Sequence, residues 1–212
     1  MSELKLHDLE LSGNCYKVRL LCALLGLKLA IAPVDFLGGE HKRKPLLAQN
    51  PFAEIPVLQD GDLALRDSQA ILVYLAEKTG RFLPKDPARR YEALQWLIFQ
   101  VAGIGPMFGQ VGFFHKFAGR DFEDRRPRDR YVAEARRLLA VLELRLGGRK
   151  WIMGDDYTIA DIAVFPWVRN LIGFYAAGDL VGITDYPQVL RALEAFMARP
   201  AVVRGLGIPA PD

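Results

Sequence analysis

Two kinds of hydrophobic pattern follow one another along the chain, and the change between them falls near residue 80. In the first part, short apolar stretches with strand-like patterns predict four β-strands, at 4–9, 29–34, 55–58 and 63–65. Apolar residues with helical spacing predict three helices in the same part, at 14–25, 41–48 and 67–78. The Asp60-Gly61 pair between the last two strands is typical of a hairpin turn. This order predicts an α/β unit with a mixed sheet.

The second part of the chain has only helical patterns. It follows a proline-containing linker at 81–87, and no strand-like alternation occurs after residue 88. Apolar residues recur with helical spacing over 131–146 and 189–197. The sequence therefore predicts two domains, an α/β domain over 1–80 and an all-helical domain over 88–212.

One segment is a candidate for a membrane span. Residues 93–114 carry no charged side chain, which is long enough for a membrane span of roughly 20 residues. The segment also holds Gln95, Gln100, Gln110 and Pro106, and it lacks aromatic and basic anchors at both ends. A buried helix with an interruption is the favoured interpretation, so no membrane partner is expected.

Composition narrows the class of protein. Among 212 residues, 51% are apolar and 25% are charged, which excludes intrinsic disorder. The formal charge of +3 is too balanced to indicate a nucleic-acid partner. Two cysteines cannot form a disulfide framework, and the N-terminal residues do not resemble a signal peptide, so a cytoplasmic protein is expected. The three histidines have no metal-ligand spacing, and no metal is predicted.

The turn before the first predicted helix is the first candidate for chemistry. It contains Ser12, Asn14 and Cys15. Backbone N–H groups and the helix dipole attract anions at a helix N-terminus, and these side chains add two donors and a thiol. Capping of the helix is the alternative, and from the turn alone it is favoured.

Two further positions carry the same ambiguity. Pro56 cannot donate a hydrogen bond to a sheet, so it starts a strand or a special turn. If the Ile55-Pro56 peptide bond is cis, the backbone of Ile55 would pair with an extended ligand. The alternative is a rigid turn with no role in binding. Asp67 and Ser68 begin the next helix and suit the ammonium and carboxylate of an amino-acid head group. For an isolated Asp-Ser pair, helix capping is again favoured.

Taken together, these motifs resemble a cytosolic glutathione S-transferase. The resemblance rests on the Ser12 turn, the run from Asn50-Pro51 to Ile55-Pro56-Val57-Leu58, the hairpin signal, the run 67–75 and the all-helical remainder. It covers nearly the whole chain. Residues 39–68 are similar to the phi class, while 12–19 and 107–115 are similar to bacterial nu-type members, and a serine-type member is implied.

The resemblance implies a thioredoxin-like N-terminal domain that binds glutathione as co-substrate, a helical domain that binds an electrophile, and a homodimer. It assigns the catalytic hydroxyl to Ser12, with Asn14 assisting. For the glycyl carboxylate of glutathione it assigns His41 and Lys42. It assigns backbone pairing with the cysteinyl part of glutathione to Ile55, which precedes the cis proline Pro56. It assigns binding of the γ-glutamyl group to Asp67 and Ser68.

Two residues depart from the family's pattern. Glu54 stands where phi enzymes usually have glutamine, and it brings a negative charge near Asp67 in the expected glutathione site. Cys15 lies three residues after Ser12 and matches no catalytic position. A mixed disulfide between Cys15 and glutathione is a minor alternative.

Thiol chemistry defines the expected role of Ser12. A free thiol has a pKa near 8.5, and lowering it by about two units requires about 2.7 kcal/mol. One charge-assisted hydrogen bond of about 1.5–3 kcal/mol, together with the helix dipole, is sufficient. Ser12 is therefore predicted to donate to a bound thiolate and not to act as a nucleophile, and no histidine–acid pair supports a serine hydrolase.

The electrophile is expected between the Ser12 turn and the uncharged segment. The candidate side chains are Met107, Phe108, Phe113, Phe114 and Trp167, and for each of them a place in the core is an equal alternative. Thr158 and Asp161 have the form of a capping box, for which a structural role is expected.

Three functions follow from these observations. The leading hypothesis is a detoxification enzyme that conjugates glutathione to small hydrophobic electrophiles. The first alternative is a glutathione-dependent disulfide or peroxide reductase on the same fold. The second is a non-catalytic binding or regulatory protein.

Overall fold

The fold consists of two units, and the chain passes from one to the other between residues 83 and 84 and again between 197 and 198. A computed structural model describes residues 3–207, and within it 3–83 and 198–207 form the first unit and 84–197 the second. The regular elements of the first unit are β1 (Leu4–Asp8), α1 (Gly13–Leu25), β2 (Leu29–Pro33), the short turn η1 (Glu40–Lys42), α2 (Leu46–Gln49), β3 (Val57–Asp60), β4 (Leu63–Arg66), α3 (Ser68–Thr79) and α10 (Pro200–Leu206).

The four strands form one mixed sheet in the order β2-β1-β3-β4. β1 is parallel to β2 and antiparallel to β3, and β3 and β4 form the predicted antiparallel hairpin. Alternation along β1 buries Leu4, Leu6 and Asp8 on one face. The α/β thioredoxin-like fold predicted for this part of the chain is confirmed.

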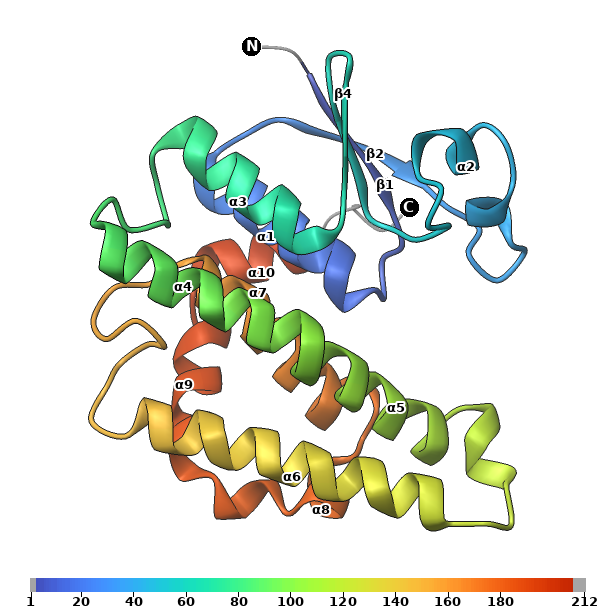
Figure 1. The fold of residues 1–212 in the computed structure, drawn as a ribbon, viewed down its shortest axis with the longest axis vertical. Helices are drawn as coiled ribbons and strands as arrows, with labels where there is room; N and C mark the ends of the chain where they lie inside the picture. The colour runs from blue at the N-terminus through green and yellow to red at the C-terminus, as the bar shows by residue number, and fades with distance from the viewer. Residues whose placement is uncertain (1–2, 208–212) are drawn as a thin grey trace. The chain divides into compact units, whose positions relative to one another are not determined.

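Helices cover both faces of this sheet. α1 and α3 pack side by side on one face, and α2 lies on the other (Figure 1). On the side of α2, Leu46 packs with Val34, Val57 and Ile55 in an apolar cluster. α1 and α3 end at Gly26 and Gly80, where φ values of +68° and +67° suit glycine.

The last helix returns to the first unit. α10 packs along α1 (Figure 1), and the Tyr16 hydroxyl donates to the Val202 carbonyl oxygen at 3.0 Å. A Cβ atom at Gly205 would lie 3.1 Å from the Leu20 Cα, so glycine permits this close approach. The predicted helical domain over 88–212 included this segment, because a helical pattern does not reveal which neighbour a helix packs against.

The second unit contains the elements α4 (Pro87–Phe99), η2 (Gln100–Ile104), α5 (Gly105–His115), η3 (Ala118–Asp121), α6 (Arg126–Leu146), α7 (Ile159–Arg169), η4 (Asn170–Phe174), α8 (Gly178–Val181), η5 (Ile183–Asp185) and α9 (Pro187–Met197). Its regular elements within the described residues are helical, with isolated bridges at Trp151–Gly154 and Met153–Asp156. The predicted helical character is confirmed.

The uncharged segment 93–114 forms the second half of α4, the whole of η2 and most of α5. The interruption expected within it is η2, one stretch of π-helix between α4 and α5. By length and composition alone, the continuous helix 87–115 could cross a membrane. In the structure α4 packs against α7, and α5 packs against α6.

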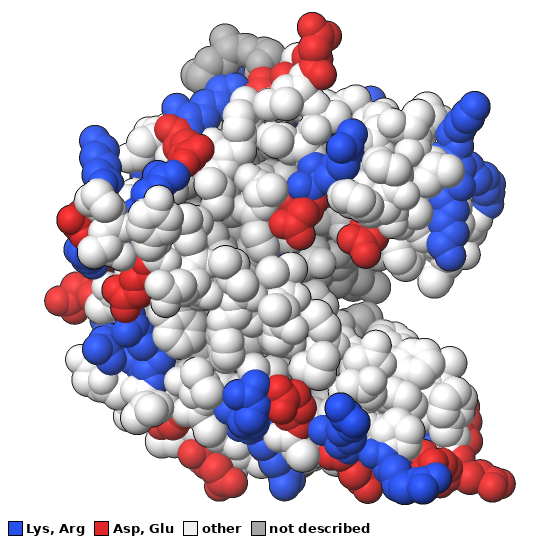
Figure 2. All heavy atoms as spheres, in the orientation of Figure 1, with Lys and Arg blue, Asp and Glu red and all other residues white. Residues whose placement is uncertain are grey.

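Charged residues of α6 and the loop before it form a mixed surface. Basic and acidic side chains lie beside one another where α6 runs along the lower margin of the view (Figure 2). Short-range ion pairs join Arg126 to Asp124 at 2.8 Å and Arg137 to Glu134 at 2.6 Å. The opposite side of α6 is apolar, with Leu138, for example, fully buried.

A buried capping box begins α7. The Thr158 side chain accepts from the Ala160 N–H at 3.2 Å, and an Asp161 carboxylate oxygen accepts from the Thr158 N–H at 2.9 Å. The other oxygen of Asp161 accepts from the Ile152 N–H at 2.9 Å. The predicted capping box is confirmed, and Asp161 also fixes the loop before the helix.

Candidate active site at the starts of α1 and α3

Ser12 is the N-cap of α1. Its backbone is extended, and its Oγ accepts a hydrogen bond from the Cys15 N–H at 3.3 Å. The side chain is half-buried. Because Oγ acts as acceptor in the cap, the hydroxyl proton can still be donated to another group. Helix capping and donation to a ligand are therefore compatible at this residue.

A buried ion pair between Asp8 and Arg19 lies next to the Ser12 turn. Arg19 Nη1 lies 2.5 and 2.6 Å from the two carboxylate oxygens of Asp8, and Nη2 donates to the Glu10 carbonyl oxygen at 2.6 Å. Both side chains are 2% exposed. Burial raises the pKa of Asp8, and Arg19 opposes that shift. The pair fixes the end of β1 and the turn that follows it.

A fully buried lysine joins the starts of the two helices. Lys17 Nζ donates to Asn14 Oδ1 at 2.9 Å and to Ser68 Oγ at 3.3 Å. Burial lowers the pKa of Lys17 to about 7, although the negative charge of Asp67 opposes this shift. The structure thus brings together Asn14 and Ser68, which lie far apart in sequence. Lys17 was not among the site residues predicted from the sequence; its spacing from Asn14 indicates a shared helix face but not its burial.

Asp67 is the N-cap of α3. Its Oδ1 accepts from the Gln69 N–H at 2.8 Å and from the Ala70 N–H at 3.0 Å, with the backbone at φ +68°. The residue is exposed, whereas Ser68 is 2% exposed and faces Lys17. The capping alternative thus describes Asp67, and binding of an ammonium group by it remains a prediction.

The other predicted glutathione residues lie on η1 and on the loop before β3. His41 is buried and stacks on Phe36 with ring centroids 4.0 Å apart, while Lys42 is exposed. Glu54 is exposed, and Ile55 is half-buried. The peptide bond between Ile55 and Pro56 is cis.

The two cysteines are inaccessible. Cys15 and Cys22 have 0% and 1% exposure, and burial raises the pKa of each thiol to about 12. The Cys15 Sγ also accepts a hydrogen bond from the Leu9 N–H at 3.5 Å. Both thiols are therefore protonated at neutral pH, which disfavours a mixed disulfide at Cys15.

The predicted electrophile residues occupy different environments in the second unit. Phe108 is fully buried in the core, which agrees with the alternative interpretation of this residue. Phe113 and Phe114 are half-buried, with ring centroids 5.0 Å apart, in an aromatic cluster on α5. Trp167 packs against the glycine face of α5, where its ring lies 3.6 Å from the Cβ position of Gly109.

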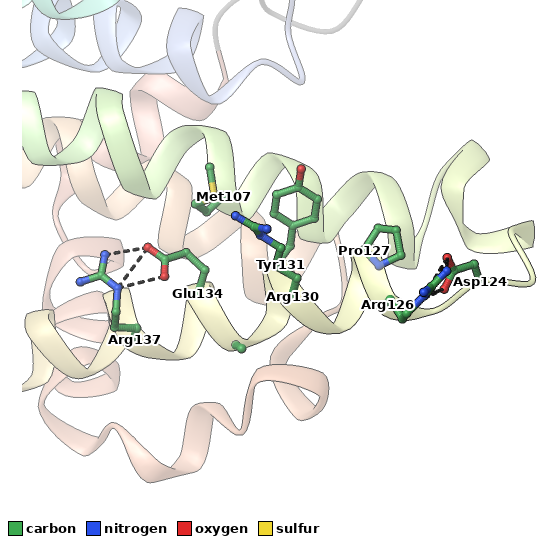
Figure 3. Close-up of a pocket in the computed structure, with 9 residues that line it drawn as sticks. Met107, Asp124, Arg126, Pro127, Arg130, Tyr131, Glu134 and Arg137 are labelled. Atoms are coloured by element: carbon green, nitrogen blue, oxygen red, sulfur yellow. Dashed lines mark hydrogen bonds and ion pairs between the residues drawn. The ribbon is translucent and has the colours of Figure 1, made fainter.

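Met107 lines a groove of about 1080 Å³ between α5 and α6 (Figure 3). The side chains around it are mainly charged or polar: Asp124, Arg126, Arg130, Tyr131, Glu134 and Arg137, with Pro127 and Ala133. Glu134 and Arg137 pair with each other on α6 at one end of the groove, and Asp124 and Arg126 pair at the other (Figure 3). Of the five predicted electrophile residues, Met107 is the one in this groove, and the groove is more polar than expected.

Comparison with known proteins places both parts of the chain in one family. Residues 6–83 match the N-terminal domain of glutathione S-transferase, and residues 107–198 match its C-terminal domain. The disulfide-bond oxidoreductase YfcG of Escherichia coli K12 is 36% identical over 200 residues, covering 91% of this chain and 90% of that protein. Another curated relative, 40% identical, is longer, and the chain spans 59% of its length.

Two solved structures are more similar in sequence. A glutathione transferase from Burkholderia graminis, with two glutathione molecules bound per subunit, is 55% identical with a TM-score of 0.95, covering 100% of this chain and 90% of that one. One from Pseudomonas putida, with one glutathione disulfide bound per subunit, is 48% identical with a TM-score of 0.95, covering 99% and 93%. On its sequence, its two-part fold and these similarities, the chain belongs to the glutathione S-transferase family.

Proposed function

We propose that this protein is a glutathione-dependent disulfide reductase. The observation that carries the proposal is the state of the two cysteines, which are buried and have thiol pKa values of about 12. The chain itself therefore offers no thiolate at neutral pH, and the reacting thiols must arrive with the substrates. Glutathione, the co-substrate expected from the sequence, supplies such a thiol.

The reaction consumes two glutathione molecules. The thiolate of the first attacks one sulfur of a disulfide R–S–S–R, which forms a mixed disulfide and releases one R–SH after protonation. The thiolate of the second attacks the glutathione sulfur of that mixed disulfide, which forms glutathione disulfide and releases the second R–SH. The two electrons gained by the substrate come from the two glutathione thiols, so no other reductant is needed.

The ligands of the similar structures fit this stoichiometry. Two glutathione molecules, as in the Burkholderia graminis protein, correspond to the reductant pair, and glutathione disulfide, as in the Pseudomonas putida protein, corresponds to the product. YfcG, which is similar over most of both chains, bears the name of a disulfide-bond oxidoreductase. These similarities favour thiol–disulfide chemistry over conjugation.

The residues at the helix starts have complementary roles in this proposal. Ser12 donates its hydroxyl proton to the thiolate of the first glutathione, and Asn14 assists. The N-terminus of α3, with Asp67 and Ser68, holds the γ-glutamyl group, since backbone N–H groups suit its carboxylate and the Asp67 carboxylate suits its ammonium. His41 and Lys42 hold the glycyl carboxylate, and the backbone of Ile55 pairs with the cysteinyl part. A cytoplasmic homodimer belongs to the same proposal.

A second candidate is conjugation of glutathione to hydrophobic electrophiles. The half-buried aromatic side chains on α5, Phe113 and Phe114, favour it because they offer apolar surface to such a substrate. Parallel assays with hydroxyethyl disulfide and with chlorodinitrobenzene separate the two functions. We expect the larger kcat/KM with the disulfide; turnover of chlorodinitrobenzene alone would instead support conjugation. Absence of glutathione binding would favour a non-catalytic protein.

Replacing Ser12 by alanine tests the role of the hydroxyl. We expect kcat/KM for disulfide reduction to fall about 10- to 100-fold and the pKa of bound glutathione to rise by about one to two units, because a charge-assisted hydrogen bond is lost. Ultraviolet absorbance of the bound thiolate against pH measures that pKa directly. Ser12→Thr, which retains a hydroxyl and a helix cap, is the matched control and should retain most activity. Full activity of Ser12→Ala at neutral pH would contradict the assignment.

A further inference from the structure

The inference concerns Lys17, and it rests on the proposed binding of glutathione. We propose that Lys17 is a positioning residue for glutathione: its ammonium holds Asn14 and Ser68 so that both present hydrogen-bond donors to the bound tripeptide. The lysine is fully buried on α1, and its Nζ lies 2.9 Å from Asn14 Oδ1 and 3.3 Å from Ser68 Oγ. It therefore acts through Asn14 and Ser68.

The chemistry of an ammonium group determines the orientation of those partners. A lysine ammonium has three donors and no acceptor, so whatever it contacts must accept. Asn14 consequently turns its carbonyl oxygen toward Lys17, and its NH₂ group, on the other side of the amide carbon, is directed away. Ser68 Oγ also accepts from Lys17, so its hydroxyl proton is directed to another group. Glutathione presents a thiolate and a γ-glutamyl carboxylate, both of which need donors.

Burial disfavours the charged form of Lys17. Burial disfavours the ammonium more than the carboxylate of Asp67 stabilises it, and the pKa of Lys17 falls to about 7. The thiol of Cys15, on the same helix, also acts on Lys17. The nearby starts of α1 and α3 add the positive ends of two helix dipoles. An anionic ligand at this place stabilises the charged lysine, so binding should raise its pKa.

Calorimetric titration with S-methylglutathione, which has the same carboxylates but no ionisable thiol, tests the role of Lys17. At pH 6.5, Lys17→Met should weaken binding about 10- to 100-fold, as expected for lost charge-assisted hydrogen bonds. Its melting temperature should stay close to that of the wild type, because the substitution removes the desolvation cost of a buried cation together with the hydrogen bonds to Asn14 and Ser68. Lys28→Met, at an exposed lysine, is the matched control and should bind normally. A purely structural lysine would instead lower the melting temperature, which would overturn the proposal.

Proton uptake gives a second measurement that does not depend on folding of the variant. Because burial lowers the pKa of Lys17 to about 7, a large part of Lys17 is neutral in the free protein at pH 8. Wild type should therefore take up a fraction of a proton on binding S-methylglutathione at pH 8, and less at pH 5.5, where more of the lysine is already charged. Titrations in buffers of different ionisation enthalpy measure this number. Lys28→Met should retain the uptake, and Lys17→Met should abolish it.

The outcomes separate this inference from the proposed function. If wild type binds S-methylglutathione and reduces disulfides, but takes up no proton or binds equally well as Lys17→Met, the role of Lys17 is wrong and the function stands. If wild type binds neither glutathione nor S-methylglutathione, the proposed function is overturned, and the role of Lys17 with it. Weakened binding, unchanged stability and lost proton uptake in Lys17→Met support both.

Discussion

Arg19→Met is expected to lower the free energy of unfolding by about 3–5 kcal/mol, because it leaves the Asp8 carboxylate buried without its partner. Both oxygens of that carboxylate lie within 2.6 Å of Arg19 Nη1, and both side chains are 2% exposed. The substitution also removes the hydrogen bond from Arg19 to the Glu10 carbonyl oxygen. The turn that carries Ser12 would therefore lose its support together with the core.

The loss should grow with pH. Burial already raises the pKa of Asp8 above its value in the unfolded chain, and the attraction of Arg19 limits that rise. Without Arg19 the pKa of Asp8 rises further, so the folded variant binds a proton that the unfolded chain releases. Stability of the variant is consequently greatest at acid pH and declines as the pH rises from the unfolded value through the raised folded value. Urea denaturation at pH 5 and pH 8 measures this difference.

Two controls identify the buried pair as the cause. Asp8→Leu combined with Arg19→Met removes both charges and should be less destabilised than Arg19→Met alone. Arg126→Met breaks an ion pair with Asp124 at the surface and should cost less than about 1 kcal/mol. A loss below about 1 kcal/mol for Arg19→Met would show that the pair does not hold the turn.

Local patterns predicted most elements of this fold. The period-two alternation at β1, the helical spacing of α1 and α3, and the glycines that end those helices are all consequences of short-range geometry. The packing of α10 against α1 has no such local signal, since it depends on contacts between Tyr16 and Val202, which are distant in sequence. Tertiary packing, which periodicity does not encode, decided that part of the fold.

Some residues of the candidate site could likewise be predicted from the sequence, and others could not. Ser12, Asn14, Asp67 and Ser68 follow from helix starts and from the family resemblance, and the structure brings Asn14 and Ser68 to one ammonium. Lys17 itself was missed because a lysine in a helix is ordinarily solvated, and one sequence gives no sign of its burial. Similarly, Phe108 and Phe113 are equivalent in type, but Phe108 is fully buried in the core and Phe113 is half-buried.

Asp161→Ala is the second substitution with a large expected effect, a loss of about 3–5 kcal/mol in the free energy of unfolding. The Asp161 carboxylate is fully buried and accepts from the backbone N–H groups of Ile152 and Thr158, each at 2.9 Å. Alanine leaves two buried donors unsatisfied and a small cavity, and each unsatisfied donor costs about 1–3 kcal/mol. The loop before α7 and the start of α7 would lose their common anchor.

Tryptophan fluorescence is a direct measure of this effect, because the three tryptophans, Trp96, Trp151 and Trp167, all lie in the second unit. Thr158→Ala is the matched control, since it removes only the capping hydroxyl and should cost about 1 kcal/mol. The loss of stability in Asp161→Asn should lie between those of the two alanine variants. Its amide oxygen still accepts from one N–H, but its NH₂ group faces the other N–H. If Asp161→Ala and Thr158→Ala unfold at the same urea concentration, the cap alone accounts for the stability of this turn. A larger loss for Asp161→Ala would instead show that its carboxylate joins the loop to the helix, as the two hydrogen bonds indicate.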